Sequence, residues 1–174
     1  ERDENGLIKG LDYIFDENGR INWRKMIKNE YLVPNKDRTQ ETDITKLEDK
    51  DILVLLNGFK NILSIRGYIN VNYESLATGQ DFCSIKCSID FMPSYETEGR
   101  SVQFSSTGDA TYNNTTPING KYYLTSIAEN RAFVRCVRNA LGIEILGRDE
   151  FISNKDNNNQ FENISNSPID PYTI

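Results

Sequence analysis

The feature of this sequence that most constrains the fold is a stretch in which apolar and polar residues alternate strictly. Its apolar residues occupy every second position: Cys83, Ile85, Cys87, Ile89 and Phe91. Successive side chains of a β-strand point to opposite faces of the sheet, so the pattern predicts a strand with one buried and one solvated face. The two cysteines are then small core residues rather than metal ligands. Pro93 marks the end of the strand, because proline cannot donate to a β-ladder.

Two further strands flank this one in the sequence. The alternation recurs between residues 68 and 73, ahead of a glycine-containing turn at 78–80. A third strand is expected near residues 101–112, after a second turn at 98–99. Together these segments predict a three-stranded antiparallel meander with one apolar face.

A helix is expected on each side of this meander. Thr45 has the features of a helix N-cap, with Glu48 at the spacing of a capping box. A longer helix is expected from about Tyr122 to Leu141, ending at Gly142. The apolar residues after Thr45 recur at the spacing of one helix face: Ile52, Leu55, Leu56, Phe59, Ile62 and Leu63. The predicted fold class is α+β: a three-stranded antiparallel β-meander packed on a long C-terminal helix and preceded by an N-terminal helix, a β-β-β-α core.

The chain divides into three parts by composition. Residues 1–45 are predicted to form an irregular N-terminal extension in which Trp23 has a packing role. Residues 46–152 form the core domain. Residues 153–174 are rich in Asn and Ser and are predicted to be a flexible tail.

The composition also excludes several kinds of chemistry. The chain has no histidine, which removes imidazole catalysis and histidine zinc ligands. Its three cysteines form no CxxC pair, so we expect neither zinc nor a disulfide framework, and a reducing intracellular setting is the simplest one. No stretch approaches the roughly eighteen apolar residues of a membrane span. There is no GxxxxGK[ST] loop, so we expect no nucleotide hydrolysis.

Three arginines of the final helix are the strongest indication of function. The whole chain carries a net charge of −6, but residues 121–148 hold five basic residues against two acidic ones. Arg131, Arg135 and Arg138 fall at i, i+4 and i+7, within a sector of roughly sixty degrees on the helix. Guanidinium groups about one turn apart suit successive phosphates of a nucleic acid. The alternative is that they pair with acidic residues, of which only two lie nearby in the sequence.

The outward face of the predicted sheet adds weaker candidates. Lys86 belongs to the polar set of the central strand, and we assign the aromatic residues Tyr68 and Phe82 to the same face. Aromatic rings that stack on bases, beside cations that neutralise phosphates, are typical of proteins that bind single strands. The candidate DNA-binding residues are therefore Arg135, Arg138, Arg131, Lys86, Tyr68 and Phe82.

The order of these elements and several short motifs resemble the single-strand annealing proteins, the group of the eukaryotic Rad fifty-two protein and its phage relatives. The resemblance extends from about Ile52 to Phe151. It rests on Gly67-Tyr68 before the first strand, Ser106-Thr107-Gly108-Asp109-Ala110 at the end of the third, Arg135-Cys136-Val137-Arg138 in the last helix, and the closing segment Asn139-Ala140-Leu141-Gly142-Ile143-Glu144-Ile145-Leu146-Gly147-Arg148-Asp149.

The resemblance implies a function and an assembly. Arg135 and Arg138 would contact the phosphate backbone of single-stranded DNA. Subunits would join sheets edge to edge into a ring or helical arc, and complementary strands would anneal in homologous recombination and DNA repair. No ATP, cofactor or covalent chemistry is implied. The expected location is the cytoplasm, that of the host cell if the protein is a phage recombinase, and the tail would recruit a single-strand-binding protein.

Three alternatives stay open at this point. An OB-type module would use similar aromatic and basic residues but needs about five strands. A metal-dependent nuclease would use Asp81, Asp90 and Asp109. A recombination mediator or other interaction protein would bind single strands without annealing them and recruit partners through the tail.

Overall fold

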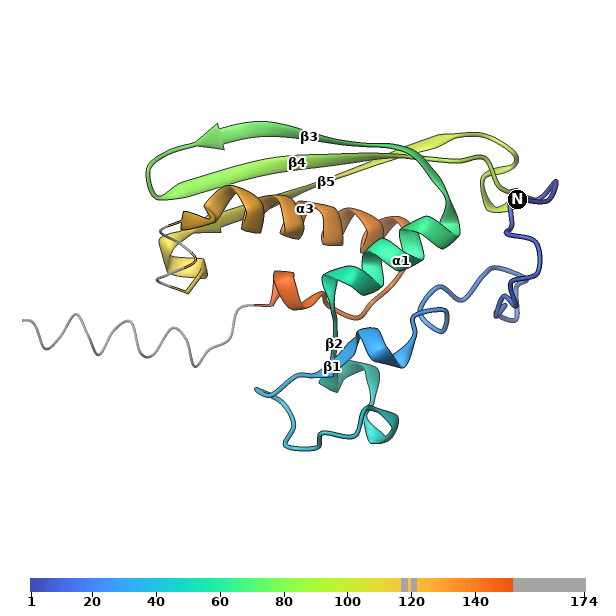
Figure 1. The fold of residues 1–174 in the computed structure, drawn as a ribbon, viewed down its shortest axis with the longest axis horizontal. Coiled ribbons are helices and arrows are strands. Elements are labelled where there is room, and N and C mark those ends of the chain that lie inside the picture. The colour runs from blue at the N-terminus through green and yellow to red at the C-terminus, as the bar shows by residue number, and fades with distance from the viewer. Residues whose placement is uncertain (117–118, 120–121, 152–174) are drawn as a thin grey trace, which may run out of the picture.

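The molecule is built around a three-stranded antiparallel sheet with one long helix on its inner face (Figure 1). A computed structural model describes residues 1–116, 119 and 122–151. The sheet has the order β3 (Tyr68–Thr78), β4 (Phe82–Phe91) and β5 (Val102–Thr111), and α3 (Leu124–Ala140) covers it. Helix α1 (Leu56–Arg66) precedes the sheet. The predicted α+β class and meander are therefore confirmed, while the predicted tail, 153–174, lies outside the described residues.

β4 has one buried and one more exposed face, as the alternation of its residues predicted. The odd-numbered residues from Cys83 to Phe91 are buried, and the residues between them are not. The hairpin to β3 is closed by Gly79, whose amide donates to the carbonyl of Phe82 at 2.9 Å. Both cysteines lie in the hydrophobic core, together with Cys136 of α3.

Helix α3 approaches the sheet most closely over Gly108. A Cβ atom at this position would lie 2.4 Å from the amide nitrogen of Ala132 and 2.6 Å from the carbonyl oxygen of Ala128. Because both neighbours are helix backbone atoms, no side-chain rotation relieves the clash. Glycine at this position of β5 therefore sets the distance between helix and sheet.

Replacing Gly108 by alanine should destabilise the fold by roughly 2 kcal/mol, because α3 must move away from β5. For a chain of this length the melting temperature should fall by roughly 6 °C, measured by circular dichroism. Thr107→Ala is the control, since Thr107 is exposed on the same strand. A Gly108→Ala variant that melts with wild type would contradict the close approach.

The start of α1 differs from the prediction. Thr45 lies in a short 3₁₀ helix, Ile44–Lys46, whose N-cap is Asp43. Residues 52–54 form β2 (Ile52–Val54) instead of helix, pairing antiparallel with β1 (Leu32–Pro34). The reason is that Ile52, Leu53 and Val54 are buried consecutively, which a strand between two packed layers permits and a one-faced helix does not.

Both long helices end at glycines in the left-handed region. Gly67 follows α1 with φ 87°, and Gly142 follows α3 with φ 63°. The predicted stop of the last helix at Gly142 is thus confirmed within one or two residues. Arg2 covers the end of α1 by donating to the carbonyls of Ser64 and Ile65, each at 3.0 Å.

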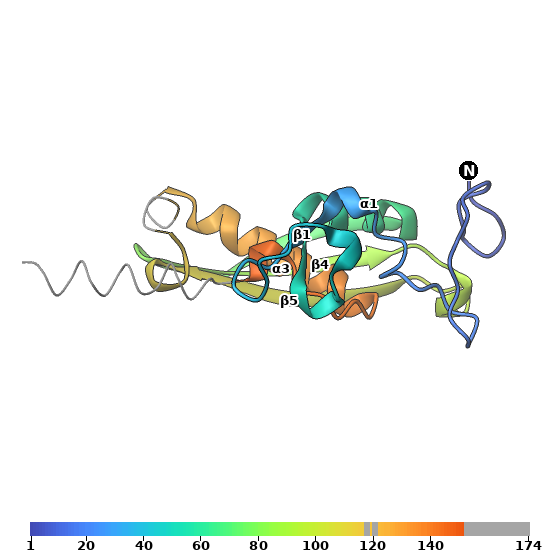
Figure 2. The ribbon, with the colours of Figure 1, turned by 90° about the horizontal axis from the view of Figure 1, so that it is seen from below.

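The N-terminal extension packs against the same core. Ile21, Trp23, Ile27 and Leu32 are all buried there, so the predicted packing role of Trp23 is confirmed. Figure 2, seen from below, shows the β1 and β2 part of the chain in front of the layers formed by α3 and the sheet. Among the described residues, no helix is both long enough and apolar enough to traverse a bilayer.

Candidate nucleic-acid interface

Arg131, predicted as a DNA-binding residue, is buried rather than open to a ligand. Only 7% of it is exposed. Its guanidinium donates to the Asp149 carbonyl at 2.9 Å, the Asp109 carbonyl at 2.8 Å, and the side-chain and backbone oxygens of Asn114 at 2.7 and 2.6 Å. Burial lowers the pKa of Arg131, although Asp109 and Asp149 oppose the shift. This arginine ties three segments together and has little capacity left for a ligand.

Arg135 and Arg138 converge on one carboxylate, that of Glu150. Arg135 Nε lies 3.2 Å from Oε1, and Arg138 Nε lies 2.9 Å from Oε2. Arg138 Nη2 is 3.5 Å from Oε1, and the Gly147 amide donates to Oε2 at 3.3 Å. We call these donors of Arg135, Arg138 and Gly147 the cradle. An open arginine ridge is therefore the wrong description, because the cradle already holds an oxyanion.

Exposure differs among the members of the cradle. The Glu150 side chain is 4% exposed, whereas those of Arg135 and Arg138 are 36% and 19% exposed. Arg135 also donates through Nη1 to the Thr107 carbonyl at 2.7 Å, which fixes its guanidinium at the molecular surface. Of the three predicted arginines, Arg135 is therefore the one that solvent reaches most readily.

The segment after α3 carries Glu150 to this position. Ile143 and Ile145 are buried, and the Leu146 carbonyl accepts from the Val54 amide at 3.0 Å. The chain then forms the short 3₁₀ helix η6 (Arg148–Glu150), which packs beneath α3 in Figure 1. Glu150 is twelve positions from Arg138, so proximity in sequence did not reveal the ion pair.

Lys86 lies on the opposite side of the sheet from the cradle. It alternates with the buried residues of β4 and therefore points away from α3. Its ammonium lies 3.6 Å from a carboxylate oxygen of Glu74 on β3. Lys86 is on the predicted outer face, but this face does not adjoin the arginines of α3.

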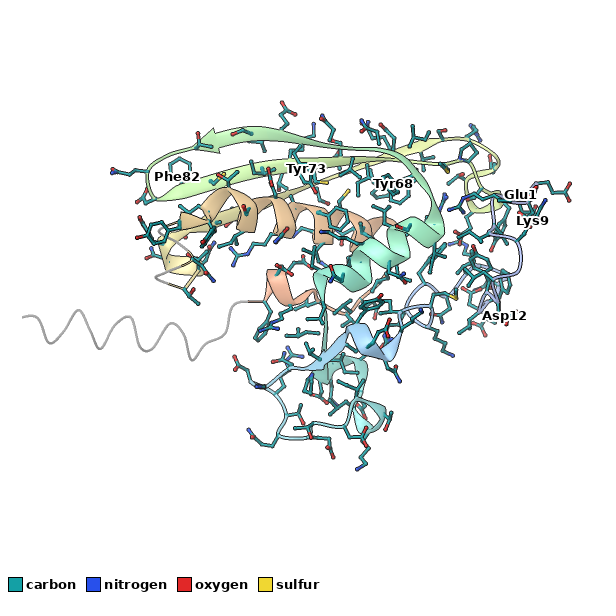
Figure 3. All side chains as sticks on the ribbon, viewed as in Figure 1. Glu1, Lys9, Asp12, Tyr68, Tyr73 and Phe82 are labelled. Atoms are coloured by element: carbon teal, nitrogen blue, oxygen red, sulfur yellow. The ribbon has the colours of Figure 1, made fainter. Side chains whose placement is uncertain are left out.

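The two candidate aromatic residues are far apart. Tyr68 is paired with Phe91, whose side chain is buried toward α3. Because directly paired residues of antiparallel strands point to the same face, the assignment of Tyr68 to the outer face with Lys86 is wrong. A register irregularity between Tyr68 and Asn70 shifts the alternation there. Phe82 lies at the other end of the sheet, where its ring occupies the space next to Gly79. Figure 3 shows Tyr68 and Phe82 toward opposite ends of the sheet. Phe91, the partner of Tyr68, lies nine residues along β4 from Phe82, which at the rise of a β-strand is roughly 30 Å.

The two edges of the sheet are not alike. On β5, Arg131 and Arg135 donate to the carbonyls of Asp109 and Thr107, which lie two residues apart and so point the same way. β3 is exposed along its length because α3 packs on β4 and β5. Large exposed side chains on β3 are Tyr68, Ile69, Tyr73 and Leu76.

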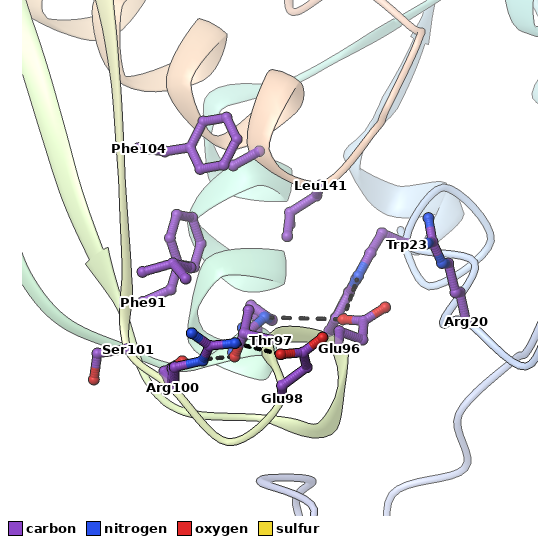
Figure 4. Close-up of a pocket in the computed structure, with 13 residues that line it drawn as sticks. Arg20, Trp23, Phe91, Glu96, Thr97, Glu98, Arg100, Ser101, Phe104 and Leu141 are labelled. Atoms are coloured by element: carbon purple, nitrogen blue, oxygen red, sulfur yellow. Dashed lines mark hydrogen bonds and ion pairs between the residues drawn. The ribbon is translucent and has the colours of Figure 1, made fainter.

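A cleft of about 640 Å³ lies where the end of α3 faces the loop between β4 and β5 (Figure 4). Buried Arg66 lines it, with its guanidinium carbon 5.5 Å from the centre of the Phe91 ring. Burial lowers the pKa of Arg66, opposed by Glu96, whose carboxylate is 4.0 Å away. Glu98 pairs with Arg100 on the same wall. The acids thus balance much of the positive charge, and the cleft is a poorer candidate for a polyanion than the cradle.

The carboxylates proposed for a nuclease are not brought together. Asp90 accepts from Gln103 at 2.7 Å, and Asp109 accepts from Asn114 at 2.9 Å. In residues 1–116, 119 and 122–151, no group of three histidine, cysteine or acidic side chains has the arrangement of a metal site. The contact with Cys136 and burial raise the pKa of the Cys87 thiol, which disfavours a nucleophilic thiolate there.

No protein-family model, curated protein or solved structure matches this chain.

Proposed function

We propose that this protein binds single-stranded DNA without sequence preference and anneals complementary strands, without ATP, as a homo-oligomer. The observation that carries the proposal is the cradle on α3, where two guanidinium groups and a backbone amide meet one oxyanion. A backbone phosphate presents oxygens of similar charge and spacing, and arginine forks bind it well. Non-specific binding needs contacts of this kind and no base readout.

The exposed strand β3 supports the oligomer. An edge strand offers unpaired backbone groups to another chain, and proteins that stay monomeric protect such edges with charge or irregularity. The strand spans eleven residues and exposes both aliphatic and aromatic side chains. Register irregularities interrupt it at Tyr68/Asn70 and Ser75/Ala77, so the regular stretch between them, residues 70–75, is the part of this edge that is open to pairing. A second copy of the chain is the partner that this surface suits in the proposed assembly.

Binding and annealing without nucleotide test this proposal. The full chain should bind fluorescent oligo(dT), with an affinity that falls steeply as salt rises, since each phosphate contact releases counterions. It should also speed the pairing of two complementary oligonucleotides in EDTA. An affinity for oligo(dT) that does not change with salt concentration would contradict contact with the phosphate backbone.

The same assays separate the alternatives. Binding without faster annealing identifies a plain binding module or a mediator, and cleaved oligonucleotide in magnesium identifies a nuclease. Electron micrographs with a long oligonucleotide provide the test of assembly: rings or arcs support annealing by an oligomer, and isolated monomers count against it.

A further inference from the structure

We propose that Glu150 is an internal competitor for DNA: its carboxylate occupies a phosphate-binding site on α3, and the backbone of a bound strand displaces it. This inference rests on the proposed function and adds a regulatory step to it.

The contacts of Glu150 are those that a phosphate oxyanion would make. Both carboxylate oxygens are bound, Oε1 by Arg135 and Arg138 and Oε2 by Arg138 and the Gly147 amide. Two of the three donor residues stay in place if the carboxylate leaves, because Arg135 is also held by the Thr107 carbonyl and Gly147 by the segment before it. Among the described residues Arg138 is held by Glu150 alone, so its guanidinium would pass directly from the carboxylate to the incoming phosphate. Arg135 and Gly147 therefore preorganise the site for an anion of this size.

The mobile part of such a switch would be short. Up to Gly147 the segment is anchored by buried Ile143 and Ile145 and by a bridge to Val54. Beyond Gly147, the backbone of η6 has two local hydrogen bonds, from the Glu150 amide to the Gly147 carbonyl and from the Phe151 amide to the Arg148 carbonyl. The Asp149 carbonyl also accepts from Arg131. Withdrawal of this turn thus frees the cradle at the cost of the Asp149 contacts with Arg131 and Asn130, while Ile143 and Ile145 stay buried.

The direct test compares two neighbouring charge removals in the full chain. Glu150→Gln weakens the competitor, so affinity for oligo(dT) should rise on the order of tenfold, within the usual range of coupling between two binding events. Because the bound strand contacts the same phosphates in both proteins, the slope of log affinity against log salt should differ by less than the roughly 0.7 expected for one phosphate. Asp149→Asn removes the same charge from the same turn without touching the cradle, and its affinity should stay within about twofold of wild type.

The outcomes separate this inference from the function on which it rests. Wild-type binding with no gain in Glu150→Gln overturns the competitor role and leaves DNA binding in place. No binding by either protein overturns both. A gain that persists in Glu150→Gln/Arg135→Gln/Arg138→Gln, measured against Arg135→Gln/Arg138→Gln, also counts against the cradle, because no freed guanidinium would then be its cause.

A measurement on wild-type protein avoids dependence on the folding of variants. Saturating oligo(dT) should speed hydrogen exchange at the Glu150 and Phe151 amides and leave the Val54 amide protected. Inorganic phosphate at the same phosphate concentration should have little effect if the ligand is a polynucleotide backbone. Unchanged exchange at η6 with bound oligo(dT) would contradict displacement of the turn.

Discussion

Replacing Arg131 by alanine should lower the free energy of unfolding by roughly 3–4 kcal/mol, a large part of the stability of the fold. The side chain is buried, and its guanidinium supplies donors to Asp109, Asn114 and Asp149. A buried acceptor left without a partner costs about 1–3 kcal/mol, and part of this loss is recovered when water enters the space. Since domains of this size are stable by only about 5–15 kcal/mol, the urea midpoint should fall markedly.

Lysine at the same position provides the matched control. Arg131→Lys keeps the charge but offers one ammonium in place of a planar fork, so it should recover only part of the loss. An alanine variant with an unchanged midpoint would show that the three segments hold together without Arg131. A large loss of DNA binding in a fully folded Arg131 variant would instead indicate that Arg131 contacts DNA.

Removing both charges of the cradle should have the largest effect on DNA binding. Arg135→Gln/Arg138→Gln should weaken oligo(dT) binding about a hundredfold, near 1.4 kcal/mol for each guanidinium. The slope of log affinity against log salt should fall by about 1.4, because two phosphate contacts are lost. Fluorescence anisotropy at several salt concentrations measures both quantities.

The control for this experiment lies on the other side of the sheet. Lys86→Gln removes a cation that faces away from α3 and pairs with Glu74. Its affinity should stay within about twofold of wild type. If Lys86→Gln proves as harmful as the double variant, the strand follows the outer sheet face and the cradle is structural. Circular dichroism of each variant separates a lost contact from a lost fold.

The sequence predicted the sheet well because alternation is a local property. Each residue of β4 is buried or exposed according to its own parity, and no distant residue has to be known. The start of α1 was mispredicted because an apolar spacing that suits one helix face also fits a short buried strand followed by a helix. Tertiary pairing with β1 decides between the two at Ile52.

The candidate site was predicted less well because the burial and ion pairing of its arginines depend on residues distant in the sequence. The positions of Arg131, Arg135 and Arg138 on one side of α3 followed from helical geometry. Their partners did not, since Asn114 and Glu150 reach them only through the turns that surround the helix. Among the described residues, Glu129 and Glu144, the acids nearest in sequence, form no ion pair with these arginines, whereas Glu150 pairs with two of them.

In the proposed oligomer, the unequal edges of the sheet would give a chain of copies a direction. Arg131 and Arg135 cover the second half of β5 by donating to the carbonyls of Asp109 and Thr107. A neighbour's β3 would therefore find a part of β5 without guanidinium cover only in the first half, around Val102 to Ser106. Such a contact joins two different surfaces head to tail, so an open chain of copies has an unpaired β3 at one end and an unpaired β5 at the other. Growth stops when the rotation per step brings the last copy back to the first. A small change in how α3 sits on the sheet would therefore alter the number of copies in a closed circle.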